Sequence, residues 1–188
     1  MVQNGQTAAE RAEIRENQVN WVLRVRRGDE AAMDALVSMH RQRLIRVASN
    51  VLRDRHEAED VAQESFLKAF REIRKLRDDR AFSGYIYRIC VRLCMDRLRS
   101  RKPTSEMIEH GDGTSGSKVE TKVLVERLLQ ELTPDLRMTL VLREMEELSY
   151  DEVAELMQVP VGTVRSRLHA ARNRFRELWI DSTGEAHL

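Results

Sequence analysis

Arginines crowd one short segment near the end of the chain, between Pro160 and Arg176. This segment holds five arginines and no acidic residue. Arginine is permanently charged, and its planar fork of donors matches both phosphate oxygens and the edge of guanine. The segment therefore carries side chains suited to binding nucleic acid. Charge alone leaves one alternative open, an exposed basic helix that binds nothing.

The residues around this segment predict a helix-turn-helix. Ser149 and Glu152 have the spacing of a capping box, which opens a helix of about eight residues. That helix must stop before Pro160, because proline is accepted only in the first turn of a helix. The second helix has an inward apolar stripe of Val164, Leu168, Ala171 and Phe175. Polar residues flank that stripe or lie outside it: Thr163, Arg165, Ser166, Arg167, His169, Arg172 and Arg174. This arrangement favours DNA binding over the unliganded alternative.

A second basic segment runs from Arg88 to Lys102 and contains a single acid, Asp96. Its basic residues are Arg88, Arg92, Arg97, Arg99, Arg101 and Lys102. Such a stripe either supplies phosphate contacts with a salt-dependent affinity or forms an ordinary solvated face. Three aromatic residues, Phe82, Tyr85 and Tyr87, cluster at its N-terminal side. They would either stack on exposed bases or pack into the core.

Two cysteines, Cys90 and Cys94, lie four residues apart on one face of the same predicted helix. Free cysteine packs as a small hydrophobe, so we expect both thiols to be buried. A metal site would need further ligands close by in the sequence. We expect no metal and no cofactor, with a redox switch or metal sensor as the minor alternative. We also find no phosphate loop and no nucleophile beside an evident base, so no catalytic residue is predicted.

The composition predicts an all-α protein. Hydrophobic residues make up 41% and charged residues 34%, while three prolines and eight glycines are too few for a turn-rich β fold. The formal net charge of +1 disfavours a protein that coats DNA by bulk attraction. No stretch resembles a signal peptide or a membrane span. We therefore expect a cytoplasmic protein without membrane insertion.

Apolar periodicity and turn residues divide the chain into two small helical domains joined by a flexible linker. Helix breaks are expected at Gly28-Asp29 and at the charged turn around Asp54, and a further helix from about Phe82 to Arg101. The stretch TSEMIEHGDGTSGSK has the composition of a linker. Thr133 is expected to cap a helix that begins with Pro134. The expected parts are a polar tail that is frayed or weakly helical (1–17), an N-terminal helical bundle (18–102), the linker (103–118), a C-terminal helix-turn-helix domain (119–180) and a tail (181–188).

Three runs of sequence resemble one family. LTPDLRMTLVLREMEELSYDEVAELMQVPVGTVRSRLHAAR is similar to the C-terminal promoter-reading domain of bacterial sigma factors of the extracytoplasmic-function group. RDRHEAEDVAQESFLKAFREI resembles that family's polymerase-binding helix, and FSGYIYRICVRLCMDRLRSRKP resembles the helix that meets the minus-ten element. The resemblance covers roughly Val19 to Trp179. It implies a sigma factor that binds core RNA polymerase and directs promoter-specific initiation, with no catalytic role and no small-molecule substrate.

The resemblance also implies three groups of site residues. The polymerase-binding face carries Asp60, Gln63 and Glu64. The minus-ten group is Tyr85, Arg88, Arg92, Arg97 and Arg99. The minus-thirty-five group is Arg143, Thr163, Arg165, Ser166, Arg167, His169 and Arg172. An anti-sigma factor is a further candidate partner besides polymerase and promoter DNA, because many members of the family are held inactive by one.

The chain departs from the family at three positions. Tyr85 stands where the family usually has tryptophan, and Arg92 where it often has asparagine. Ala170 replaces a commonly basic residue in the predicted reading helix. These departures put the minus-ten preference and one DNA contact of the reading helix in question.

Two other classes of protein fit part of the pattern. A dimeric helix-turn-helix regulator with an N-terminal sensor domain would use Cys90 and Cys94 and bind a two-fold symmetric site. An enzyme with an appended DNA-binding domain would need a catalytic constellation that the sequence lacks. A sigma factor is instead expected to be a monomer that binds promoter DNA weakly alone and tightly with polymerase.

Overall fold

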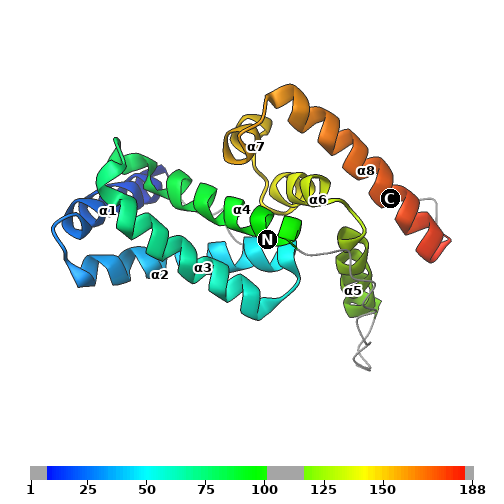
Figure 1. Cartoon of the computed structure of the whole chain (residues 1–188), viewed down its shortest axis with the longest axis horizontal. Helices are drawn as coiled ribbons and strands as arrows, with labels where there is room; N and C mark the ends of the chain where they lie inside the picture. Colours follow the sequence, from blue (N-terminus) through cyan, green and yellow to red (C-terminus); the bar gives the residue numbers. More distant parts are fainter. Residues whose placement is uncertain (1–7, 101–116, 185–188) are drawn as a thin grey trace.

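The computed structural model describes residues 8–100 and 117–184, and within these ranges all regular elements are helices (Figure 1). The predicted all-α class is therefore confirmed. The N-terminal region consists of α1 (Ala8–Val25), α2 (Glu30–Leu52), α3 (Arg55–Glu72), the 3-10 turns η1 (Ile73–Lys75) and η2 (Asp79–Ala81), and α4 (Phe82–Ser100). The C-terminal region consists of α5 (Ser117–Gln130), α6 (Pro134–Leu140), the π-helical turn η3 (Val141–Met145), α7 (Tyr150–Met157) and α8 (Val161–Thr183).

Aspartate caps define the starts of α2 and α3. The Asp29 carboxylate accepts a hydrogen bond from the backbone N–H of Ala32, and Asp54 accepts one from Glu57. These bonds satisfy N–H groups that have no partner within the helix. A hydrogen bond from Arg24 and the bond from Ala32 lower the pKa of Asp29. The two breaks that were predicted at Gly28-Asp29 and near Asp54 are thus confirmed.

The ends of the predicted domains differ from the observed helices. Helix α1 begins at Ala8, inside the expected polar tail, because this stretch is rich in alanine, glutamate and arginine, which favour helix even without an apolar stripe. Helix α6 begins at Pro134 with Thr133 at its N-cap, as predicted, although the Thr133 side chain makes no capping hydrogen bond. Helix α8 extends to Thr183 and ends at Gly184 in the left-handed region. Most of the predicted linker, and residues 185–188, lie outside the described residues.

The core is a continuous cluster that includes buried apolar residues of both regions. Phe82, fully buried at the start of α4, stacks on Phe70 and lies 5.7 Å from the ring of His40. Helix α4 also contacts α6 and α7, and α2 contacts η3. The C-terminal region is therefore packed against the N-terminal bundle along α4 (Figure 1).

The described residues contain neither a membrane-spanning helix nor a cluster of metal-binding side chains. Among residues 8–100 and 117–184, no helix has the length and hydropathy needed to cross a bilayer. The same ranges contain no group of three or more histidine, cysteine, aspartate or glutamate side chains that could hold a metal ion.

Candidate nucleic-acid interface

Helices α7 and α8 form the predicted helix-turn-helix. The capping box at the start of α7 is present: Ser149 Oγ accepts from the N–H of Glu152, and Glu152 Oε2 accepts from the N–H of Ser149 at 2.8 Å. Gln158 ends α7 in the left-handed conformation, with φ 54°. Pro160 follows as the N-cap of α8. The chain therefore turns from α7 into α8 within three residues, as this motif requires.

The inward stripe of α8 fixes which residues face outward. Val164, Leu168 and Ala171 are buried, and α8 packs against α6. The outer side chains Arg165, Ser166, His169 and Arg172 are exposed. Ser166 Oγ donates to the carbonyl of Thr163, and His169 contacts Asn173 within the helix. Helix α8 thus presents a polar face that can enter a DNA groove.

Two of the predicted DNA-binding arginines lie beside Tyr150, but one is held by a hydrogen bond and the other is exposed. The Arg143 guanidinium lies 5.3 Å from the ring centroid, and its Nη1 donates to the carbonyl of Leu148. Arg165 lies 6.0 Å from the same ring and is exposed. Arg143 therefore fixes the turn before α7, whereas Arg165 can reach a ligand by leaving a weak cation–π contact.

Two other arginines of α8 are paired with acids of their own region. Arg172 lies 2.6 Å from Glu144, and this hydrogen bond raises the pKa of the guanidinium. Arg167 is half-buried and donates to Asp135 at 3.0 Å. Sequence reasoning missed these partners, because Asp135 and Glu144 lie far from α8 in the chain.

The predicted minus-ten residues of α4 lie on more than one side of the helix. Tyr85, Arg88, Arg92 and Arg99 line one cavity, and we call these four residues the α4 face. Tyr85 Oη donates to Glu72 at 3.0 Å, and burial together with this carboxylate raises the pKa of Tyr85 to about 12. Arg92 is exposed and makes no ion pair among the described residues.

Arg97 is separated from the α4 face. Its guanidinium lies 3.3 Å from Glu64 and 3.7 Å from Glu57, two acids of α3. These pairs hold it against the N-terminal bundle. The structure therefore places Arg97 in the packing between α3 and α4, although the basic stripe in the sequence grouped it with Arg92 and Arg99.

The alternatives for the aromatic and cysteine residues of α4 are decided by burial. Tyr87 is buried and its ring lies under Arg43, so Tyr87, like Phe82, packs in the core. Cys90 and Cys94 are both buried, as predicted. A hydrogen bond with Cys90 and burial raise the pKa of the Cys94 thiol well above its ordinary value. A raised pKa disfavours the thiolate that redox chemistry needs.

The predicted polymerase-binding residues share an outer face of α3. Asp60 and Gln63 are exposed, and Glu64 pairs with Lys68 at 2.8 Å and with Arg97. The hydrogen bond from Lys68 is the largest influence that lowers the pKa of Glu64. Leu67 lies one turn further along and is 57% exposed. Sequence reasoning missed Leu67, although an apolar residue four places after Gln63 was the available signal.

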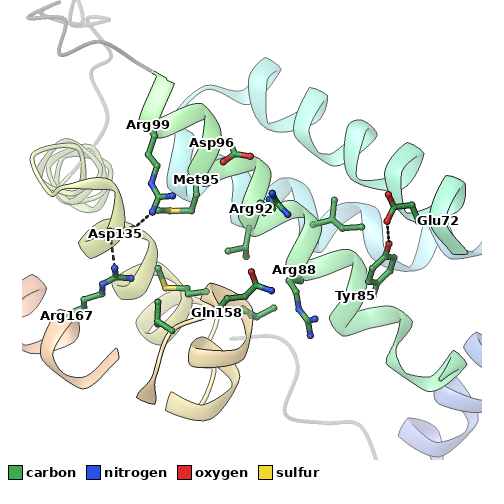
Figure 2. Close-up of a pocket in the computed structure, with 15 residues that line it drawn as sticks. Glu72, Tyr85, Arg88, Arg92, Met95, Asp96, Arg99, Asp135, Gln158 and Arg167 are labelled. Carbon is green, nitrogen blue, oxygen red and sulfur yellow. Dashed lines mark hydrogen bonds and ion pairs between the residues drawn. The ribbon is translucent and has the colours of Figure 1, made fainter. Parts of the chain in front are cut away.

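A cavity of about 480 Å³ lies between α4 and the C-terminal region (Figure 2). Its apolar wall includes Ile89 and Met95 of α4 and Leu156 of α7, and the four residues of the α4 face line it. Arg167 of α8 also lines this cavity. The structure thus brings four of the five predicted minus-ten residues together with one member of the minus-thirty-five group.

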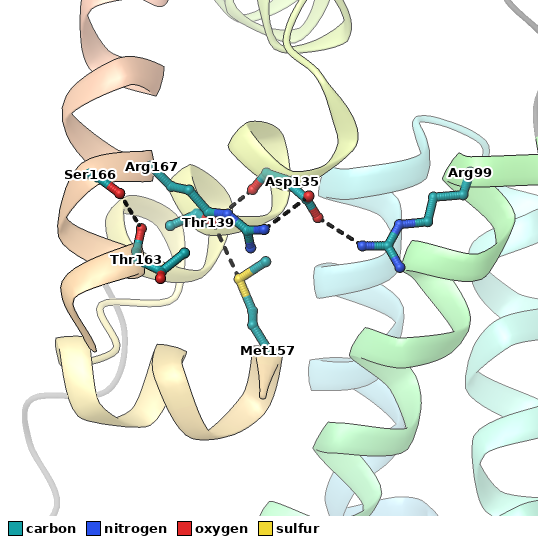
Figure 3. Close-up of polar contacts among 7 residues, drawn as sticks. All are labelled: Arg99, Asp135, Thr139, Met157, Thr163, Ser166 and Arg167. Carbon is teal, nitrogen blue, oxygen red and sulfur yellow. Dashed lines mark hydrogen bonds and ion pairs between the residues drawn. The ribbon is translucent and has the colours of Figure 1, made fainter. Parts of the chain in front are cut away.

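Asp135 connects these two groups directly. Its Oδ1 accepts from Arg99 of α4 and its Oδ2 accepts from Arg167 of α8, each at 3.0 Å (Figure 3). The residue lies in the first turn of α6. Arg88 of α4 forms a second ion pair between the regions, with Glu155 of α7 at 2.5 Å. Two arginines of the α4 face are therefore paired with acids of the C-terminal region.

Comparisons with known families match both regions of the chain. Residues 36–104 match the family described as Sigma-70 region 2. Residues 122–175 match the family described as Sigma-70, region 4. The first match includes α3 and α4, and the second includes the helix-turn-helix.

Curated relatives share this organisation over most of their length. The RNA polymerase sigma-H factor of Pseudomonas aeruginosa is 39% identical over 169 residues, covering 80% of this chain and 88% of the relative. The sigma-E factor of Escherichia coli K12 is 36% identical over the same shares. SigW of Bacillus subtilis is 30% identical and covers 83% of this chain and 93% of the relative.

Solved structures share the fold. The structure of CnrH in complex with the cytosolic domain of CnrY has a TM-score of 0.66 at 20% identity, covering 89% of this chain and 99% of that one. The sigma factor RpoE in complex with the anti-sigma factor NepR, from Bartonella quintana, has a TM-score of 0.62 at 19% identity, with coverage of 78% and 95%. With the family matches and the curated relatives, the conclusion follows that this chain belongs to the sigma-70 family of RNA polymerase sigma factors, in its extracytoplasmic-function group.

Proposed function

We propose that this sigma factor binds core RNA polymerase and reads promoter DNA at two points. The observation that carries the proposal is the α7–α8 motif, whose outer face presents Arg165, Ser166 and His169 to solvent. A helix with such a face enters the major groove and reads base edges by hydrogen bonds. We assign this face to the minus-thirty-five element, with Thr163, Arg167 and Arg172 beside it.

The α4 face is proposed to contact the minus-ten element. Arg92 supports this assignment because it is exposed and has no acid paired with it among the described residues. Tyr85 is half-buried and lines the cavity, so its ring can stack on an unpaired base that enters there. The N-terminal bundle (18–102) and the helix-turn-helix domain (119–180) would act as separate domains in this role.

Polymerase is proposed to bind the outer face of α3. Asp60, Gln63 and Glu64 supply polar contacts there, and Leu67 supplies exposed apolar surface at the same face. Apolar area with a polar surround is typical of protein interfaces. A sigma factor needs no covalent chemistry of its own. Because it acts on the chromosome, we place this protein in the cytoplasm. An anti-sigma factor is a further proposed partner, since both solved structures of this fold are complexes and the partner in one of them, NepR, is an anti-sigma factor.

Run-off transcription tests the proposal. Core polymerase is assayed with and without this protein across a promoter library, and template-specific transcripts that need the protein are expected. Arg165→Ala should reduce initiation on some promoters more than on others, because it removes a base contact. Arg174→Ala is the matched control, since Arg174 is an exposed arginine on the opposite face of α8 that pairs with Glu177. Absence of protein-dependent transcripts would refute the proposed function.

A further inference from the structure

The segment that joins α3 to α4 consists of the short turns η1 and η2 and the residues around them. The amides of Leu76 and Ala81 each donate to the carbonyl three residues earlier. Asp78 caps η2 by accepting a hydrogen bond from the N–H of Arg80. Such short turns leave other backbone carbonyls of the segment without a partner in the segment itself, and polar backbone groups in a folded protein need one. Another part of the fold must therefore hold this segment in place.

The end of α1 supplies part of this support through Arg26. Its Nη2 donates to the carbonyl of Leu76 at 2.5 Å and lies 2.6 Å from Asp79 Oδ1. Only 28% of the Arg26 side chain and 20% of the Asp79 side chain are exposed. Partial burial reduces screening by water, so this ion pair is stronger than one on the open surface. Arg26 thus joins α1 to two points of the segment before α4.

Gln18, about two turns earlier on α1, is a second link to the same segment. Its side-chain Oε1 accepts from Ser83 Oγ in the first turn of α4, and its Nε2 donates to the carbonyl of Arg80 at 3.5 Å. The residue is only 5% exposed. A buried amide is costly unless its donor and its acceptor both have partners, and here both do. The two bonds of Gln18 therefore fix where α4 begins.

These links hold the stretch of chain that carries Tyr85, the residue proposed to stack on an unpaired base. Tyr85 follows Ser83 by two residues, and its hydroxyl donates to Glu72 at the end of α3 (Figure 2). The chain from Glu72 to Tyr85 is therefore tied at its ends by this bond, and α1 lies against the part between them (Figure 1). Arg77 and Arg80 of the same part are exposed and give it positive charge.

We propose that Arg26 and Gln18 are positioning residues for promoter opening, because they hold the α3–α4 segment so that Tyr85 is in place to stack on a base of the opened minus-ten strand. This inference rests on the proposed function for the role of Tyr85. Neither positioning residue needs to touch DNA. Taking a base out of the duplex costs free energy, and stacking on a ring that is already in place offsets part of that cost. Loss of the two links therefore slows opening.

The principal test measures opening by the complete polymerase complex on a duplex promoter with a fluorescent base analogue in the minus-ten element. The fluorescence of the analogue rises when the base unstacks. Arg26→Gln removes the ion pair with Asp79, and at saturating complex it should slow opening by about tenfold, the effect of losing one hydrogen bond between charged groups. Arg26→Lys should recover part of the rate, since its ammonium can still pair with Asp79. Gln18→Leu keeps a buried side chain without polar atoms and should slow opening severalfold.

Further measurements distinguish positioning from a general loss of folded protein. Affinity for core polymerase should be unchanged, since neither Arg26 nor Gln18 belongs to the proposed polymerase-binding face. Run-off transcription from a template that is already unpaired at the minus-ten element should equal wild type, because no opening is required there. Hydrogen exchange of residues 74–84 in the free protein should be faster in Arg26→Gln and Gln18→Leu, because the segment loses its support.

Arg24→Gln is the matched control for Arg26→Gln. It removes an arginine at the same end of α1, but this arginine pairs at 2.8 Å with Asp29, the cap of α2. It should leave both the rate of opening and the exchange of residues 74–84 unchanged. A loss of opening in Arg24→Gln as large as that in Arg26→Gln would contradict the assigned role of Arg26.

The outcomes separate this inference from the proposed function. Opening at the wild-type rate in both Arg26→Gln and Gln18→Leu overturns the positioning role, and so does an equal loss on duplex and unpaired templates. Hydrogen exchange of residues 74–84 at the wild-type rate in Arg26→Gln overturns it too, whether or not the wild type opens promoters. Absence of opening and of transcripts with the wild-type protein refutes the proposed function instead.

Discussion

Helices α4 and α8 have similar runs of arginine in the sequence and different surroundings in the fold. On α8, Arg165 faces solvent, while Arg167 and Arg172 are paired with acids of their own region. On α4, Arg97 is paired within the N-terminal bundle, and Arg88 and Arg99 are paired across the two regions. A stripe of arginines along one helix is therefore available to DNA only where no acid of a neighbouring helix is paired with it.

The largest expected effect concerns His40, which is half-buried in the N-terminal region, whereas His169 of the C-terminal region is exposed. Burial, and then the charge of Arg43, lower the pKa of His40 from 6.5 to about 4. Below pH 6.5 the unfolded chain takes up a proton that the folded chain refuses, so stability is full above pH 6.5 and is lost as pH falls towards 4. The loss reaches about 3 kcal/mol.

Urea unfolding of wild type and His40→Gln between pH 7.5 and 4 measures this difference. The variant lacks the titrating ring, so its stability should fall less over this range. His169→Gln serves as the control and should follow wild type. If the unfolding free energy of all three proteins depended on pH in the same way, the loss of stability could not be assigned to His40.

Arg165→Ala tests the free arginine of α8. A bidentate contact to guanine would make the loss about 1 to 3 kcal/mol at one base pair and relax the preference there. Polymerase-dependent binding to a set of single-base promoter variants measures this loss. An equal loss on every sequence would mark Arg165 as a phosphate contact, and a similar loss for Arg174→Ala would remove the distinction between the two faces of α8.

Asp60→Lys tests the outer face of α3, on which Asp60 itself is exposed. Reversing an exposed charge in an interface should weaken binding to core polymerase by about tenfold. Co-purification and a binding titration measure this effect. Asp34→Lys is the control, because Asp34 is also exposed but lies on α2. Unchanged affinity for Asp60→Lys would contradict the assignment of this face.

The smallest expected effects compare Arg92 with Arg97. Arg97→Ala removes two partly exposed ion pairs and should cost about 0.5 to 1 kcal/mol of unfolding free energy. Arg92→Ala should leave stability unchanged and reduce the slope of log affinity against log salt by about 1, since one phosphate contact is lost. Urea unfolding and a salt series of DNA binding by the polymerase complex test both. If only Arg97→Ala changed the slope of log affinity against log salt, then Arg97 and not Arg92 would be the phosphate contact.

The elements of this protein were predictable because their signals are local. The capping box of Ser149 and Glu152, the break before Pro160 and the inward stripe from Val164 to Ala171 depend on residues within a few turns of one another. Burial of Cys90 and Cys94 followed from helical spacing among apolar neighbours. Helix α1 begins at Ala8, inside the tail that was expected to be frayed or weakly helical, because its alanine, glutamate and arginine residues favour helix without an apolar stripe.

The sequence by itself determined the helices, the helix-turn-helix and the membership in the family. The tertiary structure alone decided which arginines are free. The acids that pair with Arg88, Arg97 and Arg99 lie 67, 33 and 36 residues away along the chain. Attraction between charges falls with distance in space and is unrelated to separation in sequence, so no pattern read along one helix can reveal these partners.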